Sequence, residues 1–138
     1  MLRLLFQVKP REILRADILR RKELALEEVA PLFCSEEGIP VSSVLAILKL
    51  LKKYAQVPLG KCNPTDLQST LFKEHYFLGL FYGESRFLES NFDFLMTDIA
   101  VKHFPAISNH DLNRLAECKT LGEFVRIAIQ CGLDRALG

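Results

Sequence analysis

Apolar side chains recur along this chain at intervals of three and four residues, and this spacing restricts the fold more than any other feature. The clearest case lies between residues 42 and 53, where apolar side chains take one helical face and lysines the other. The apolar positions are Val44, Leu45, Leu48 and Leu51, and the basic ones are Lys49, Lys52 and Lys53. No segment shows the two-residue alternation that is typical of a half-buried strand. The sequence therefore predicts an all-α protein.

Three segments in the second half of the chain begin with the same helix-start signal, a hydroxyl residue followed three positions later by an acid. The pairs are Ser90 with Asp93, Ser108 with Asp111, and Thr120 with Glu123. They predict helices near 90–104, 108–117 and 120–131. Pro105 is expected to end the first of these helices, and Gly132 the last.

The first half of the chain also carries helix-start signals. Pro10 suits the first position of a helix, and a second helical stretch covers residues 24–33. Ser42 or Ser43 is the expected N-cap of the helix with the lysine face. These elements extend the helical pattern to the beginning of the chain.

Asn63-Pro64 has the cap-then-proline pattern and predicts a helix that runs to about Tyr82, where Gly83 ends it. About six helices result in all. A chain of 138 residues has room for one core, so we expect a single compact helical bundle over residues 1–138. Within it, residues 1–83 form an N-terminal helical part and residues 84–138 a second group of helices.

Composition limits the classes of partner. The net charge of +1 gives no general attraction to nucleic acid, and no apolar run approaches the ~18 residues that a membrane-spanning helix needs. Seven basic residues fall within the first 22 positions, against two acids, and we interpret them as a solvated helix face. The cysteines are scattered without a C-x-x-C pair, which is typical of buried thiols in a reducing compartment, and the cytoplasm is the expected location.

Residues for catalysis or metal binding do not form a recognisable pattern in this sequence. Glycine-rich phosphate loops, nucleophile elbows and zinc-protease motifs are missing, and the three histidines are widely separated. The spacing of His103, His110, Cys118 and Cys131 matches no usual zinc pattern. We therefore predict no catalytic residues and no metal site, and expect a protein that works by binding.

An aromatic stretch over residues 72–82 is the strongest candidate for a binding surface. Ten phenylalanines and three tyrosines are many for one small core, and any surplus would form an exposed apolar patch. The alternative is that these side chains simply fill the core. The predicted partner-binding residues are Phe72, Tyr76, Phe77, Phe81 and Phe92.

In residues 87–130, Glu89-Ser90-Asn91 begins a predicted helix that closes on Phe104, and segments 106–112 and 119–125 follow it. This arrangement resembles the second half of an acyl carrier protein. In that family a serine in an Asp-Ser-Leu motif begins a helix that closes on an aromatic residue, and a short loop, a short helix and a last helix follow. Segments 106–112 and 119–125 are similar to the loop, the short helix and the step into the last helix. Asn91 departs from the motif leucine.

The resemblance implies that residues 84–138 form carrier-like helices and that Ser90 carries a phosphopantetheine arm. A helix N-terminus suits an attached phosphate, because its backbone N–H groups and dipole attract negative charge. The expected function is then a non-catalytic carrier that presents an acyl group to partner enzymes. The alternative is a helical adaptor, chaperone or inhibitor that binds another protein, or a second copy of itself, through exposed apolar surface.

Overall fold

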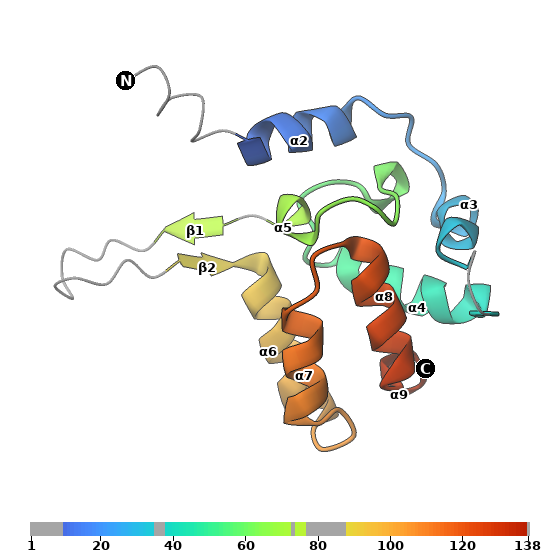
Figure 1. Cartoon of the computed structure of the whole chain (residues 1–138), viewed down its shortest axis with the longest axis vertical. Helices are drawn as coiled ribbons and strands as arrows, with labels where there is room; N and C mark the ends of the chain where they lie inside the picture. The colour runs from blue at the N-terminus through green and yellow to red at the C-terminus, as the bar shows by residue number, and fades with distance from the viewer. Residues whose placement is uncertain (1–9, 35–37, 73, 77–87, 138) are drawn as a thin grey trace, which may run out of the picture.

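The computed structural model describes residues 10–34, 38–72, 74–76 and 88–137, and these residues are mostly helical (Figure 1). The α-helices are α2 (Pro10–Leu19), α3 (Leu26–Val29), α4 (Val41–Lys52), α5 (Gln68–Leu71), α6 (Asn91–His103), α7 (Asn109–Ala116), α8 (Leu121–Gln130) and α9 (Leu133–Leu137). Two 3-10 helices, η1 (Ala30–Phe33) and η2 (Leu59–Lys61), complete the helical part. The prediction of an all-α bundle is confirmed.

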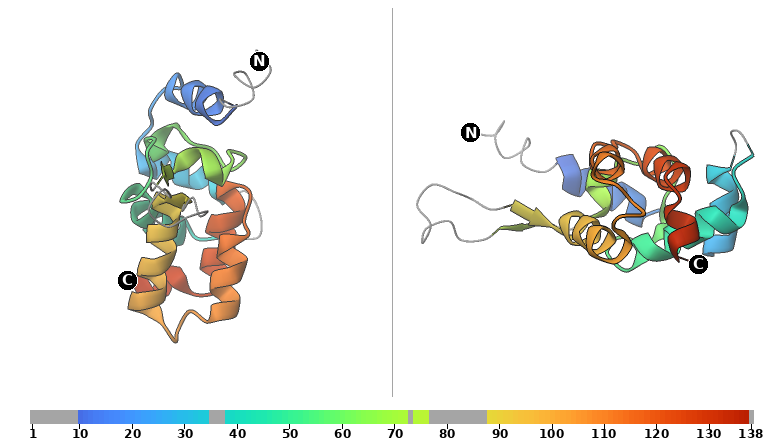
Figure 2. Two further views of the ribbon diagram at one scale, coloured as in Figure 1. Left: turned by 90° about the vertical axis from the view of Figure 1, so that its left-hand side faces the viewer. Right: turned by 90° about the horizontal axis from the view of Figure 1, so that it is seen from below.

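Helix α4 lies at the centre of the core. It contacts η1, α8 and α9, and its inward face buries Val44, Ile47, Leu48 and Leu51. Helices α6 and α7 lie side by side and run in opposite directions, joined by the loop after His103 (Figure 2). Helix α8 packs against α4, α7 and α9. Among the described residues, no helix is long and apolar enough to cross a membrane.

The helix predicted from Asn63-Pro64 to Tyr82 is wrong for the residues described. The Asn63 Oδ1 atom accepts a bond from the Thr65 backbone N–H at 3.2 Å and closes a turn there, without capping a helix. Helix α5 is only four residues long, and strand β1 (Glu74–Tyr76) follows it. Residues 77–82 lie outside the described part of the chain.

Strand β1 pairs antiparallel with β2 (Leu88–Ser90), and Glu74 faces Ser90 while Tyr76 faces Leu88. Each strand has only three residues, which is too few for period-two alternation to appear in the sequence. The backbone bonds that define the strands also come from a segment more than ten residues away, and local periodicity carries no information about such pairing.

Two of the predicted caps are confirmed, and the cap predicted at Ser42 or Ser43 is wrong, like the one at Asn63. The Ser108 hydroxyl accepts from the Asp111 N–H, and the Thr120 hydroxyl accepts from the Glu123 N–H, both at 3.2 Å. Helix α4, in contrast, begins at Val41 behind Pro40, so Ser42 and Ser43 lie inside its first turn and cap nothing. Pro40 holds φ at −67° and an extended ψ, the backbone shape of an N-cap, so no side-chain cap is needed.

The ends of α6 and α8 also follow the sequence. Helix α6 begins at Asn91, directly after Ser90, and ends just before Phe104-Pro105. Gly132 follows α8 with φ of +84°, the left-handed conformation expected after a helix. The short helix α9 that follows was not predicted, and it covers one end of the groove described below.

Candidate functional site

Ser90, the predicted attachment residue, is the last residue of β2. Its backbone is paired in register with Glu74, and α6 begins at the next residue. The side chain of Ser90 lies outside what the structure describes. The placement at a helix start agrees with the sequence, and the phosphopantetheine arm stays a prediction.

The predicted aromatic surface divides into core residues and residues that are not described. Phe72 is 2% exposed, and its ring lies 5.3 Å from that of Phe92 between centroids. Phe92 is half-buried and also meets Phe124 edge to face at 6.0 Å. These three rings form one packed cluster that stabilises the core. Tyr76 lies in β1, and its side chain, like all of Phe77 and Phe81, falls outside the described residues.

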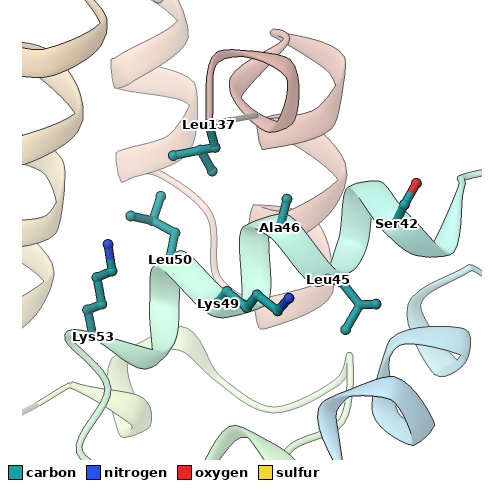
Figure 3. A pocket seen from close by; sticks show the side chains of 7 residues that line it. All are labelled: Ser42, Leu45, Ala46, Lys49, Leu50, Lys53 and Leu137. Carbon is teal, nitrogen blue, oxygen red and sulfur yellow. The ribbon is translucent and has the colours of Figure 1, made fainter.

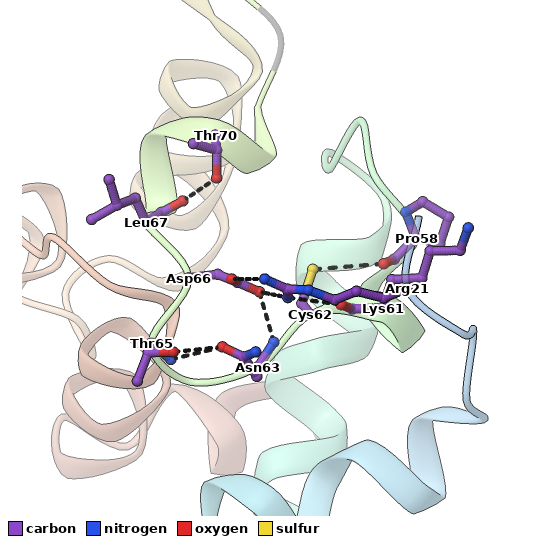
Figure 4. A network of polar contacts seen from close by, with 9 residues as sticks. All are labelled: Arg21, Pro58, Lys61, Cys62, Asn63, Thr65, Asp66, Leu67 and Thr70. Carbon is purple, nitrogen blue, oxygen red and sulfur yellow. Dashed lines mark hydrogen bonds and ion pairs between the residues drawn. The ribbon is translucent and has the colours of Figure 1, made fainter. Parts of the chain in front are cut away.

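A polar network holds the segment that follows α2 against the loop before α5 (Figure 4). The Arg21 guanidinium donates two bonds to the Asp66 carboxylate, at 2.7 and 2.9 Å, and a third to the Lys61 carbonyl. The Asn63 N–H donates to the same carboxylate at 2.8 Å. Arg15 reaches the carbonyls of Thr70 and Phe72 in the same way. Two of the basic residues interpreted as a solvated face are therefore structural.

This loop also carries the start of α8. The Asp66 carbonyl accepts from the Leu121 N–H, and the Pro64 carbonyl accepts from the Gly122 N–H, both at 2.9 Å. Asp66 is 8% exposed, and its carboxylate oxygens already accept hydrogen bonds from Arg21 and from the Asn63 N–H. A carboxylate with these fixed partners is a structural support and has little room to bind a substrate.

The cysteines are free thiols, and Cys62 and Cys118 are buried as the sequence predicted. Burial raises the pKa of Cys62 to about 12 and that of Cys118 to about 11, and it also raises the pKa of the half-buried Cys34 and Cys131. Thiols with raised pKa values hold little of the reactive thiolate at neutral pH. Among the described residues, no group of three or more His, Cys, Asp or Glu side chains could hold a metal ion.

A second polar contact joins the end of α4 to α6. The Tyr54 hydroxyl donates to the Asp98 carboxylate, which also accepts from Lys102 at 3.2 Å. The bond to Asp98 raises the pKa of Tyr54 to about 12, and the bonds from Tyr54 and Lys102 lower the pKa of Asp98. Asn91 donates to the Tyr54 carbonyl at 3.0 Å. These contacts fix one side of α6 against α4.

Another face of α6, opposite its buried residues, presents apolar side chains to water. Val101 is 76% exposed, Phe104 60% and Phe94 45%, and Thr97 lies exposed between them. The spacing 94, 97, 101, 104 places these four residues on one helical face, which we call the α6 outer face. The inner face of the same helix buries Leu95 and Ile99.

Sequence reasoning missed the α6 outer face, although a signal was present. A helix that covers one core needs a single apolar stripe, and α6 carries apolar residues on two opposite faces. The prediction instead placed the surplus aromatics in the 72–82 stretch. Phe104 was interpreted only as the aromatic residue that closes the helix in the carrier resemblance.

A groove of about 400 Å³ runs along α4 beside the C-terminal helix α9 (Figure 3). Leu50 and Ala46 point toward Leu137, and Lys49 and Lys53 stand along the helix. Its complete lining is Ser42, Leu45, Ala46, Lys49, Leu50, Lys53 and Leu137. We call this depression the α4 groove. The lysine face was predicted correctly, but the groove depends on α9 and was not foreseen.

These residues form one exposed apolar surface on α6 and one groove along α4 whose floor is apolar. Among the described residues, no cluster of His, Cys, Asp and Glu side chains could hold a metal ion. No protein-family model, no curated protein and no solved structure matches this chain, so the interpretation of its function depends on the geometry described above.

Proposed function

We propose that this protein is a helical binding domain that recognises another protein through the α6 outer face. One observation carries the proposal: Val101 and Phe104 are more than half exposed, on a helix whose other face already supplies the core. Water penalises such surface at about 25 cal/mol per Å² of apolar area, so covering it by a partner is favourable.

The surroundings of the α6 outer face fit a protein partner. Phe94 and Phe104 are aromatic, the class of side chain that is enriched at the centres of interfaces. Lys102 and Asp98 pair with each other at the edge of this face and supply a polar rim. Tyr54 donates to Asp98 and accepts from Asn91, and these two bonds hold α6 in place before a partner binds.

Site-specific photocrosslinking in the cell of origin tests this function. A benzoylphenylalanine replaces Val101 in one variant and the exposed Glu28 of α3 in a matched control. We expect one discrete crosslinked protein from position 101 and none from position 28. Equal yields from both positions, or no crosslink at 101, would contradict the proposal.

A charge variant provides the second arm of the test. Val101→Glu with Phe104→Glu places two carboxylates on the α6 outer face, and the partner found by crosslinking should bind at least tenfold more weakly. Because both side chains are exposed, the thermal unfolding midpoint should stay close to that of the parent protein. A folded variant with unchanged binding would remove this surface from the interface.

A phosphopantetheine carrier is the second candidate, and the order of the helices favours it. Helix α6 begins directly after Ser90, and the capped helices α7 and α8 follow in the sequence of the family resemblance. Coexpression with a phosphopantetheinyl transferase should then add the mass of one arm, and Ser90→Ala should abolish the addition. An unchanged intact mass, under conditions that modify a control carrier protein, would exclude this function.

A further inference from the structure

We infer that the α4 groove is a second docking site, which binds an acidic amphipathic helix of a partner protein. This surface is separate from the α6 outer face and stands on its own observations. The groove runs beside residues 42–53 of α4, which at 1.5 Å per residue corresponds to about 16 Å, or about three helical turns. That length suits one short helix laid along it.

The lining of the α4 groove is apolar along its floor. Leu45, Ala46, Leu50 and Leu137 are aliphatic, and Leu50 and Ala46 point toward Leu137 across the groove (Figure 3). Aliphatic side chains at helical spacing receive the i, i+4 and i+7 side chains of an amphipathic helix. The occupant therefore presents aliphatic residues on one face.

The positive charge of the groove favours an occupant with negative charge. Lys49 and Lys53 are the charged residues of its lining, both are exposed, and no acid lines it. Within the described part of the chain, neither lysine forms an ion pair. Their spacing of four residues places both ammonium groups on one side of α4, where carboxylates of a bound helix can meet them.

A neighbouring groove on the other side of α4 differs in the charges that line it. That groove, of about 770 Å³, is lined by Lys49, Lys52 and Lys53, but Glu23 and Glu27 line it as well. The two acids offset two of the three lysines, so this groove attracts an acidic segment less than the α4 groove does. The α4 groove differs from it by lacking these acids.

Two other occupants fit the groove less well. A nucleic acid would require more cations and aromatic rings for base stacking, and the lining contains two lysines and no aromatic residue. A fatty acid requires a cavity that removes most of its chain from water, whereas this groove is an open surface depression. A helix of a partner protein needs only one of its faces covered.

A titration of the full chain with two synthetic helical peptides of about 16 residues tests the inference. Both carry leucines at i, i+4 and i+7, and one has glutamates at the flanking positions where the other has lysines. In nuclear magnetic resonance spectra of the labelled protein, the acidic peptide should shift the backbone amides of residues 42–53 and of Leu137. The basic peptide should bind at least tenfold more weakly.

Charge variants assign the binding to the two lysines. Lys49→Glu with Lys53→Glu should lower the affinity for the acidic peptide at least tenfold and raise the affinity for the basic one. Lys22→Glu with Lys119→Glu makes the same change in net charge at exposed positions outside the groove, and should alter affinity less than twofold. All four side chains are exposed, so each double variant should remain folded, as its unfolding midpoint will show.

Several outcomes would overturn the inference. These are no binding of the acidic peptide, equal affinity for both peptides, or amide shifts that lie outside the groove. A parallel titration with dodecanoate tests whether the groove binds a fatty acid. Shifts in the groove with dodecanoate, and none with the acidic peptide, would assign the site to a small lipid and reject the helix.

Discussion

Helices α6 and α8 both carry several apolar side chains, but they place them in opposite environments. The buried residues of α8 are Leu121, Phe124, Val125 and Ala128, which all face the core. Helix α6 buries only Leu95 and Ile99, and it leaves Phe94, Val101 and Phe104 exposed. Apolar content therefore does not distinguish a structural helix from a binding helix. The number of helix faces that neighbouring elements cover does distinguish them.

The cause of the difference lies in the neighbours of each helix. Helix α8 contacts α4, α7 and α9, and the loop around Asp66 holds its first turn. Helix α6 contacts β2 and α7, and Tyr54 holds one side of it. Val101 and Phe104, on the outer face, stay more than half exposed. Substitutions on α8 should act on stability, and substitutions on the outer face of α6 should act on binding.

The largest effect is expected from Phe124→Ala in α8. Phe124 is fully buried and packs against Phe92, so the truncation opens a cavity in the core. We expect a loss of about 3–5 kcal/mol in the free energy of unfolding, measured by chemical denaturation. Phe104→Ala on α6 makes the same change at an exposed site and should cost within about 0.5 kcal/mol. Equal losses would invalidate the comparison of the two helices.

Gly122→Ala should have the next largest effect. In an exposed helix this change stabilises by up to about 1 kcal/mol, because glycine is a poor helix former. Here a Cβ atom at position 122 would lie 2.9 Å from both Cβ and the carbonyl oxygen of Pro64. Displacing this backbone should cost about 1–3 kcal/mol, so the expected sign is reversed. A stabilised variant would show that the loop at Pro64 does not hold α8.

Thr120→Ala removes the cap of α8 and should cost about 1 kcal/mol in unfolding free energy. The Thr120 hydroxyl satisfies the Glu123 N–H, which would otherwise lack a partner within the helix. Thr97→Ala in the middle of α6 is the matched control, and it should be neutral or slightly stabilising because alanine is the better helix former. A destabilised Thr97→Ala variant would indicate that the outer face of α6 already contributes to the fold.

The smallest effect on stability is expected from Val101→Ser. This side chain is mostly exposed, so the unfolding free energy should change by no more than about 0.5 kcal/mol. Val125→Ser in α8 makes the same substitution in the core and should cost about 2–3 kcal/mol, from lost apolar burial and a buried hydroxyl. A large loss at Val101 would assign the α6 outer face to the core instead of to a partner.

Local signals predicted most of the helices in the second half of the chain. The hydroxyl residues at Ser108 and Thr120 and the glycine at Gly132 act within one helical turn, so their effect does not depend on the rest of the molecule. The predicted helix was wrong where the backbone conformation depended on residues distant in the sequence. The segment after Asn63 is the example, because its turn and strand are stabilised by Arg21, by the start of α8 and by β2.

The candidate surfaces were less predictable than the helices. Phe72 and Phe92 looked like surplus aromatic surface, and the structure places them around Phe124 in the core. Val101 was not among the predicted surface residues, and it is the most exposed of the large apolar side chains described. Which face of a helix is covered depends on the direction in which its neighbours cross it, and spacing along the chain does not contain that direction.

The sequence alone determined that this protein is a helical bundle and where several of its helices begin and end, because periodicity and capping act over three or four residues. The tertiary structure decided that Arg15 and Arg21 are structural, that Val101 and Phe104 stay exposed, and that Leu137 completes the α4 groove. The physical reason is that burial, ion pairing and grooves arise between segments distant in sequence, whose approach only the packed core specifies.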